Sequence, residues 1–411
     1  MKTKKWYKLD NIGKFYASIK NTRIPKVFRY SAILKEEIDK KILQDALNKT
    51  TEIFTNFNVN LKKGLFWYYL DETNKKNIVT EENLPVCFKL YNNSDDFLYR
   101  VSYFKRKINL EVSHILSDGK GGIEFFKLLL ANYLNEKYKL KIDTTKNNVS
   151  AAQKTEDSFS KYYQKFKVTK KKKEKPYIYK GKKYRNQTKF MECHMNVKEV
   201  LKIAHEYNTT LTGILIAVLI YSFKDELKLS EMDKYIKIDV PVDLRNYFKS
   251  SSCMNFFSLT TISYKFNSKE DELKNIVKEV NKQLKENLTK EKLSERVNLM
   301  VSFEKNWFCK CSPLFLKDLV LNLADRIYTQ KSTTCFSNVG IIKLDKEIED
   351  KVESISVLTS TGGFQFNACT LKDDLCLCIS SSYVNNDIIK NFCRYFSLKN
   401  INMKIDVSEV E

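Results

Sequence analysis

Hydrophobic positions follow two spacings along the chain, and together they predict a layered α/β fold. Segments with apolar residues at every third or fourth position indicate helices with one buried face. Short aliphatic and aromatic runs between turn residues are typical of strands. Helices are predicted at about 36–54, 121–134, 158–166, 197–207, 211–227, 273–288, 313–328 and 387–396. Strands are predicted at about 27–33, 65–70, 86–91, 97–104, 107–113, 188–195, 235–240, 256–264, 333–340, 363–371 and 375–382. Because strands and helices are mixed in both halves, the fold class is α/β.

The pattern predicts two domains with a linker between them. Apolar periodicity fades from residue 137 to residue 189, and the lysine-rich run 170–175 lies inside this stretch. A chain of 411 residues is also longer than one ordinary domain. We therefore predict an N-terminal domain at 1–145, a linker at 146–189 and a C-terminal domain at 190–411.

Net charge suggests anionic partners without selecting one. The 72 Lys and Arg residues exceed the 50 Asp and Glu residues, which gives a formal charge of +22. Such a charge attracts acidic proteins, lipids or phosphorylated cofactors. The lysines are spread over most of the chain, so most of them are expected to be solvated. The linker lacks the interleaved aromatic and basic residues of nucleic-acid modules, and no nucleic-acid partner is expected.

Cysteine spacing and the apolar runs argue against several other classes. The ten cysteines include two pairs separated by one residue but no pair separated by two, so no metal site is expected. The N-terminus has no apolar leader, and we expect a cytoplasmic protein with reduced thiols. The longest apolar run, residues 211–223, is shorter than the roughly 20 residues that span a bilayer, so no transmembrane segment is predicted.

One of the three histidines has a plausible chemical neighbour. His114 follows a predicted strand, and Asp118 and Gly119 close the turn before a predicted helix. Negative charge is favoured at a helix start, while an imidazole at a strand end is suited to acid–base chemistry. His194 lies within a strand and His205 late in a helix, where structural roles are more common.

The segment His114-Ile115-Leu116-Ser117-Asp118-Gly119 resembles the H-x-x-x-D-G motif of the chloramphenicol acetyltransferase-like superfamily. This superfamily includes alcohol acetyltransferases, plant-type acyl-CoA transferases, wax ester synthases and condensation domains. Three further segments are similar to family segments in the same order, at 201–223, 239–245 and 336–340. A second histidine before the motif is common in the family, but Ser113 stands there, and the plant-type D-F-G-W-G segment is absent. The resemblance is therefore nearest to the alcohol acetyltransferase-like branch.

The resemblance implies two similar α/β sandwich domains, each a mixed sheet flanked by helices, with a tunnel at their interface. In that family the motif histidine is a general base, which implies that His114 removes a proton from a hydroxyl or amine acceptor. The acceptor then attacks the thioester of acyl-CoA, and no covalent acyl-enzyme forms. Asp118 would be a structural brace paired with Arg245, and Gly119 would permit close packing.

Several features of the implied acyltransferase stay open. Ser337 and Asn338 are candidate oxyanion or tunnel residues, as are the hydroxyls of residues 359–361. The donor could be acyl-CoA or a phosphopantetheine thioester on an acidic acyl carrier protein. A rival from another class is a non-catalytic protein that binds an anionic partner through its basic surface. We expect a monomer with a small-molecule alcohol or amine acceptor and no permanently bound cofactor.

Overall fold

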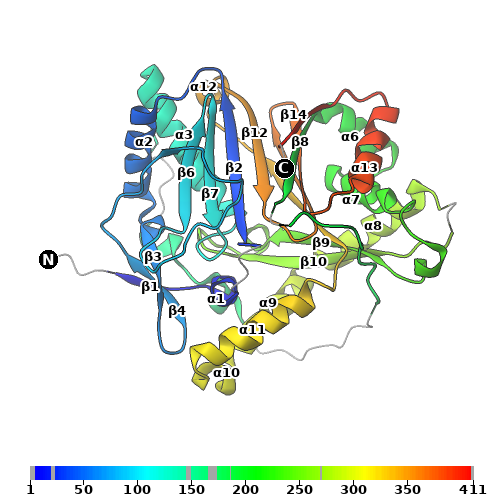
Figure 1. Cartoon of the computed structure of the whole chain (residues 1–411), viewed down its shortest axis with the longest axis horizontal. Coiled ribbons are helices and arrows are strands. Elements are labelled where there is room, and N and C mark those ends of the chain that lie inside the picture. Colours follow the sequence, from blue (N-terminus) through cyan, green and yellow to red (C-terminus); the bar gives the residue numbers. More distant parts are fainter. Residues whose placement is uncertain are drawn as a thin grey trace.

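The computed structural model describes residues 5–19, 24–144, 150–164, 174–185, 187–268 and 271–408. Two sheets stand side by side, and helices cover their outer faces (Figure 1). Helices α2 (Lys40–Ile53) and α3 (Gly119–Tyr138) pack against each other beside the N-terminal sheet. This layered α/β arrangement agrees with the fold class predicted from the sequence.

The N-terminal sheet has five strands in the order β12-β2-β7-β6-β5. Its bounds are β12 Val352–Thr359, β2 Val27–Leu34, β7 Lys107–Ser113, β6 Tyr99–Phe104 and β5 Thr80–Glu81. A small sheet beside it has the order β1-β4-β3, from Trp6–Lys8, Tyr68–Glu72 and Val59–Lys63. Helix α1 (Asn11–Ser18) follows β1. Strand β7 is the central one for function, because the chain leaves its end at Ser113 and turns into α3.

The C-terminal sheet has seven strands in the order β10-β9-β11-β13-β14-β8-β15. Its bounds are β10 Phe257–Tyr264, β9 Ile236–Asp243, β11 Thr334–Ile341, β13 Phe364–Leu371, β14 Asp374–Ser381, β8 Lys189–Asn196 and β15 Lys404–Val407. Its helices are α6 Val197–Glu206, α7 Leu211–Ser222, α8 Leu273–Asn287 and α13 Asp387–Leu398. Three further helices, α9 Lys290–Lys305, α10 Trp307–Cys311 and α11 Leu314–Tyr328, lie at the lower end in Figure 1.

Strand β12 connects the two halves of the chain. It comes from the C-terminal half but pairs antiparallel with β2, from Val352 opposite Leu34 to Thr359 opposite Phe28. Its backbone also meets thiols of the other sheet, since the Val357 amide donates to Cys378 Sγ at 3.2 Å. The two sheets are thereby held together, while the domain division at residues 145 and 190 stays a prediction.

Most predicted elements are present, with three informative differences. The predicted strand at 86–91 is wrong: this segment is a loop, in which Cys87 has a φ of 56° and donates its amide to Glu111 Oε1. Strand β12 and helix α9 were not predicted. The helix predicted at 158–166 is the shorter α5 (Ser158–Tyr162), and the lysines at 170–173 lie outside the described residues.

Helix α7 is the buried helix that its apolar sequence predicts. Its residues Gly213 to Ile220 are all buried, and it packs on α6, α8 and α13. Among the described residues no single helix has the length and apolar character to cross a membrane. Helices α6 and α7 reach that length and apolar character only when taken together, and they are bent by 79° relative to each other.

Glycines at the start of α3 allow the chain segments around the motif to approach closely. A Cβ added to Gly121 would lie 2.1 Å from the backbone oxygen of Cys253, and one added to Gly122 would lie 2.6 Å from the Phe28 ring. At Gly119 the nearest atom, Tyr30 Oη, would be 3.2 Å away. The closest packing therefore falls at Gly121, two residues beyond the glycine expected from the motif.

We predict that Gly121→Ala destabilises the protein by about 1–3 kcal/mol, because backbone must move to admit the methyl group. Alanine in an open helix would have the opposite effect, since it is the better helix former. Chemical denaturation measures the difference. Gly363→Ala is the matched control, because its added Cβ would have no neighbour nearer than 3.9 Å. A Gly121→Ala protein as stable as the wild type would contradict the packing described here.

Candidate active site

The side chain of His114 lies at the end of β7 among aromatic rings. Its ring centroid is 4.8 Å from that of Phe28, 5.5 Å from that of Tyr16 and 6.0 Å from that of Phe257. Burial among these rings lowers the pKa of His114 to about 4, because the protonated ring loses its hydration. The imidazole is therefore neutral near pH 7 and able to accept a proton.

Short-range hydrogen bonds form the turn that follows His114. The hydroxyl of Ser113 accepts from the Ile115 amide at 3.2 Å, and the Leu116 amide donates to the Ser113 carbonyl at 2.9 Å. Asp118 then caps α3, with Oδ1 accepting from the Gly121 amide at 2.9 Å. Aspartate at this position satisfies an amide that the helix itself leaves without a partner.

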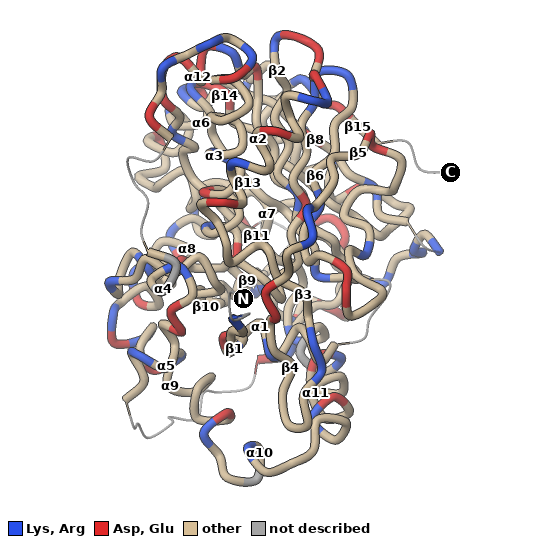
Figure 2. Tube along the Cα trace, turned by 90° about the vertical axis from the view of Figure 1, so that its left-hand side faces the viewer, with Lys and Arg blue, Asp and Glu red and all other residues tan. Residues whose placement is uncertain are grey.

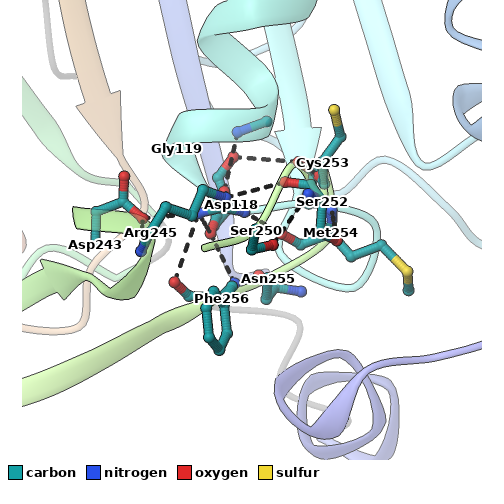
Figure 3. A network of polar contacts seen from close by, with 12 residues as sticks. Asp118, Gly119, Asp243, Arg245, Ser250, Ser252, Cys253, Met254, Asn255 and Phe256 are labelled. Atoms are coloured by element: carbon teal, nitrogen blue, oxygen red, sulfur yellow. Dashed lines mark hydrogen bonds and ion pairs between the residues drawn. The ribbon is translucent and has the colours of Figure 1, made fainter. Parts of the chain in front are cut away.

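Asp118 and Arg245 form a buried ion pair across the two halves of the chain (Figure 3). Arg245 Nη1 lies 2.8 Å from Asp118 Oδ2, and Nη2 lies 3.3 Å from Oδ1. Oδ2 also accepts from the Phe256 amide at 2.8 Å. The structure thus brings together two residues that the motifs indicated, although 127 positions separate them in sequence. Asp118 is occupied by these contacts and holds the turn in place.

Arg245 also organises the loop that leads into β10. Its Nη1 contacts Asp243 Oδ1 at 2.9 Å, and its Nε and Nη2 donate to the carbonyls of Ser252 and Met254 at 3.0 and 2.6 Å. Burial alone lowers the pKa of Arg245, but Asp118 and Asp243 outweigh it and the pKa is raised. The guanidinium is therefore charged and fully engaged, which fixes the loop against the motif.

This loop carries Asn255, a residue that no motif indicated. Asn255 Nδ2 donates to Asp10 Oδ2 and to the carbonyl of His114, each at 2.9 Å. Asp10 Oδ2 also accepts from the Asn255 amide at 3.0 Å, and Oδ1 caps α1 by accepting from the Gly13 amide at 2.7 Å. Burial raises the pKa of Asp10 to about 7, although these N–H donors favour the carboxylate. The side chain of Asn255 is thereby held with its nitrogen toward Asp10.

A cavity of about 1710 Å³ contains the His114 side chain. Both sheets contribute to its wall, with Phe28 from β2, Asp243 from β9 and Ser337 from β11. Pockets for a single small ligand are usually about 300–1,000 Å³. This cavity therefore has room for two substrates and lies where a tunnel between domains was expected.

The candidate oxyanion residues all line the cavity but differ in the hydrogen bonds that they already make. Asn338 Nδ2 donates to Thr212 Oγ1 at 2.9 Å, and its Oδ1 accepts from the Gly340 amide at 2.9 Å. The hydroxyls of Thr359, Ser360 and Thr361 each accept a hydrogen bond from a neighbouring N–H. Because a hydroxyl that accepts a hydrogen bond still has its own O–H to donate, Ser337, Thr359, Ser360 and Thr361 all stay candidate oxyanion donors, whereas one N–H and the oxygen of the Asn338 amide are already engaged.

Other polar clusters in the described ranges have structural roles. His194 Nδ1 lies 2.9 Å from Asp374 Oδ2 on the neighbouring strand, away from the cavity. No group of three or more His, Cys, Asp or Glu side chains within the described ranges has the geometry to hold a metal ion. Figure 2 shows Lys and Arg scattered over the trace, in keeping with mostly solvated lysines.

Comparisons with known proteins show the fold. No family model and no curated protein matches the sequence. Among solved structures, TRI101 of Fusarium graminearum, determined with coenzyme A and T-2 mycotoxin, matches with a TM-score of 0.66 at 10% identity, over 97% of this chain and 99% of that one. The trichothecene 15-O-acetyltransferase of Fusarium sporotrichioides matches with a TM-score of 0.61 at 13% identity, over 94% and 93%.

A third similar structure is the first condensation domain of the calcium-dependent antibiotic synthetase, with a TM-score of 0.62 at 10% identity, over 96% of each chain. All three likenesses extend over nearly the whole of both chains. At 10–13% identity these likenesses show the fold alone, and the layered α/β fold that the resemblance implied is confirmed.

We predict that Arg245→Ala destabilises the protein by about 3–5 kcal/mol, because it leaves the Asp118 carboxylate buried without its counter-charge. Denaturant unfolding measures this loss. Lys198→Ala is the control, since its ion pair with Asp373 is exposed and contributes little. Equal stability of the Arg245→Ala protein and the wild type would show that the pair does not brace the site.

Proposed function

We propose that this chain, which has the fold of the chloramphenicol acetyltransferase-like superfamily, is an acyltransferase that moves an acyl group from acyl-CoA to a hydroxyl or amine. The observation that carries the proposal is a neutral, partly buried imidazole in a cavity built from both sheets. A base that is neutral at pH 7 can remove a proton from an acceptor. The acetyltransferases with the same fold, one of them determined with coenzyme A, support this reaction class.

In the proposed reaction, His114 Nε2 takes the acceptor proton as the acceptor oxygen or nitrogen attacks the thioester carbonyl. The tetrahedral intermediate then collapses, the carbon–sulfur bond breaks, and the imidazolium returns the proton to the leaving thiolate. No covalent acyl-enzyme is required. The charge of Asp118 favours the protonated ring, so it stabilises the state in which His114 holds the proton.

Asn255 is proposed to set the tautomer of His114. His114 Nδ1 and Asn255 Oδ1 are both buried without a hydrogen-bond partner. We propose that these two atoms pair with each other, in keeping with the Asn255 side chain raising the pKa of His114 against the effect of burial. Asp10 holds the amide nitrogen, which leaves Oδ1 to accept from Nδ1–H. That tautomer has its lone pair on Nε2, where the proposed base requires it.

Ser337 is the proposed oxyanion donor. Its hydroxyl lines the cavity, whereas the amide of Asn338 is occupied by Thr212 and Gly340. A hydroxyl aimed at the developing negative charge stabilises the tetrahedral intermediate. Asn338 would then shape the wall near Gly340, whose φ of 83° suits glycine.

A carrier-bound donor is the second candidate. The net charge of +22 and the likeness to a condensation domain favour it, since carrier proteins are acidic. Both donors present the same thioester to His114, so the proposed chemistry is common to them. The cytoplasmic location and the monomeric state stay predictions.

We predict that His114→Ala lowers kcat by about 10²- to 10⁴-fold, the usual contribution of a positioned base. Release of coenzyme A from a panel of acyl-CoA donors and alcohol or amine acceptors measures the rate, and denaturant unfolding checks the fold. His205→Ala is the control, because this exposed histidine lies at the end of α6. Undiminished transfer by a folded His114→Ala protein would refute the proposed base.

The pH profile tests the proposed role of Asn255. For the wild type, kcat/KM should stay constant from neutral pH down to about pH 5 and fall around pH 4, as His114 becomes protonated. Asn255→Asp places a carboxylate beside Nδ1, which stabilises the imidazolium. The acid limb of the profile, where kcat/KM falls, should therefore move to higher pH. Asn255→Ala should lower kcat about five- to tenfold with little change in KM, through loss of one hydrogen bond. An acid limb that stays in place in Asn255→Asp, together with an unchanged kcat in Asn255→Ala, would assign Asn255 a structural role only.

A further inference from the structure

Helix α11 exposes apolar side chains and buries charged ones, the reverse of an ordinary surface helix. Phe315, Leu319 and Leu323 are 64%, 70% and 59% exposed, whereas Lys317 and Asp318 are buried. The exposed three recur at every fourth position and therefore form one stripe along the helix. Such a stripe facing water is unfavourable unless another apolar phase covers it.

Specific contacts fix α11 in this orientation. Lys317 Nζ donates to the carbonyl of Phe66 at 2.9 Å, and the Tyr68 hydroxyl donates to Asp318 Oδ2 at 3.0 Å. One turn from the other end, Lys26 Nζ lies 3.3 Å from Asp325 Oδ1. Rotating the helix to bury its leucines would break all of these contacts and leave the charged side chains without their partners. The apolar stripe is therefore held outward by the fold.

The helices α9 and α10 also expose apolar side chains, and together with the stripe these are here called the outer apolar face. The three helices lie at the lower end of the molecule (Figure 1). Its exposed members are Leu299 and Phe303 of α9, Trp307 of α10, and Phe315, Leu316, Leu319, Val320, Leu323 and Ile327 of α11.

Along residues 299–331, which carry this face, the exposed charges have one sign. Between residues 299 and 331 the exposed charged side chains are Lys305, Lys310, Arg326 and Lys331. The acidic side chains of the same stretch are turned inward, with Glu304 paired to Lys14 and Asp325 to Lys26. An apolar surface with a basic rim matches the interface of an anionic membrane, where apolar groups enter the acyl boundary and cations meet headgroups.

The outer apolar face is continuous with the candidate active site. Leu299, Phe303, Leu316 and Val320 belong to the face and also line the cavity that holds His114. An amphiphile leaving a membrane at this face would therefore pass from one apolar surface to another. A second copy of the chain fits the face less well, because a two-fold axis would bring the same basic rims together.

We propose that α9, α10 and α11 dock on an anionic membrane surface and that the cavity takes an amphiphilic lipid substrate from it. The docking stands on the exposed face alone, while the identity of the substrate rests on the proposed acyl transfer. Leu319 and Leu323 are the residues to change, because they are exposed and neither lines the cavity. Glutamine there removes apolar surface without changing charge.

Flotation with lipid vesicles tests the docking. The wild type and His114→Ala should float with vesicles of phosphatidylcholine and phosphatidylserine, more weakly at high salt, and much less with phosphatidylcholine alone. The pair Leu319→Gln and Leu323→Gln should weaken binding at least about tenfold. The pair Leu229→Gln and Leu398→Gln is matched, since both leucines are exposed elsewhere, and it should bind as the wild type does.

Each other outcome overturns the docking. The first is a wild-type protein that does not float, and the second is equal flotation with neutral vesicles. The third is an equal loss of binding in the two double glutamine variants. The fourth is a wild-type dimer in solution that becomes monomeric only in the Leu319→Gln and Leu323→Gln double variant. Acyl transfer is scored separately, with soluble acceptors and with acceptors held in vesicles. The Leu319→Gln and Leu323→Gln double variant should transfer acyl groups to soluble acceptors as the wild type does and should lose transfer only to acceptors held in vesicles. Flotation without any transfer would refute the proposed enzyme and leave the docking intact, whereas equal transfer to both acceptors by this pair would refute the lipid substrate.

Discussion

The buried ion pair between Asp118 and Arg245 is the constraint on which the site depends. Asp118 caps the helix that follows the His114 turn, and Arg245 leaves the C-terminal sheet at the end of β9. Because both charges are buried, each needs the other, and the two halves of the chain must meet in one geometry. The remaining donors of Arg245 hold the loop at 252–256, so the pair also positions Asn255 against His114.

Burial disfavours the charged form of both Arg245 and His114, but the two side chains differ in charge. At Arg245 two carboxylates compensate for it and keep the guanidinium charged. At His114 the surrounding rings offer no such compensation, and the imidazole stays neutral with a pKa of about 4. A fixed cation braces the fold while a neutral imidazole lines the cavity. We propose that this separation of roles lets one compact cluster serve both stability and proton transfer.

Sequence pattern predicted the features that depend on local spacing. Apolar periodicity located α2, α8 and α13, the motif spacing indicated Asp118, and the family resemblance implied Arg245 as its partner. It missed β12, whose alternation of aliphatic residues with Ser354 and Ser356 is short and is interrupted by a register shift between Val352 and Ser354. It also missed Asn255, since a lone asparagine in a loop has no signal until the fold brings it to His114. For α11 periodicity finds the apolar stripe, but only tertiary contacts such as Lys317 with Phe66 turn it outward.

The proposed reaction requires His114 to be a neutral base with its lone pair on Nε2. Nitrogen NMR of the imidazole rings as a function of pH measures both parts, and with three histidines the spectrum can be assigned by single substitutions. We expect a His114 signal with the proton on Nδ1 and a midpoint near pH 4. A proton on Nε2 at neutral pH, or a midpoint near the usual value of about 6.5, would contradict it.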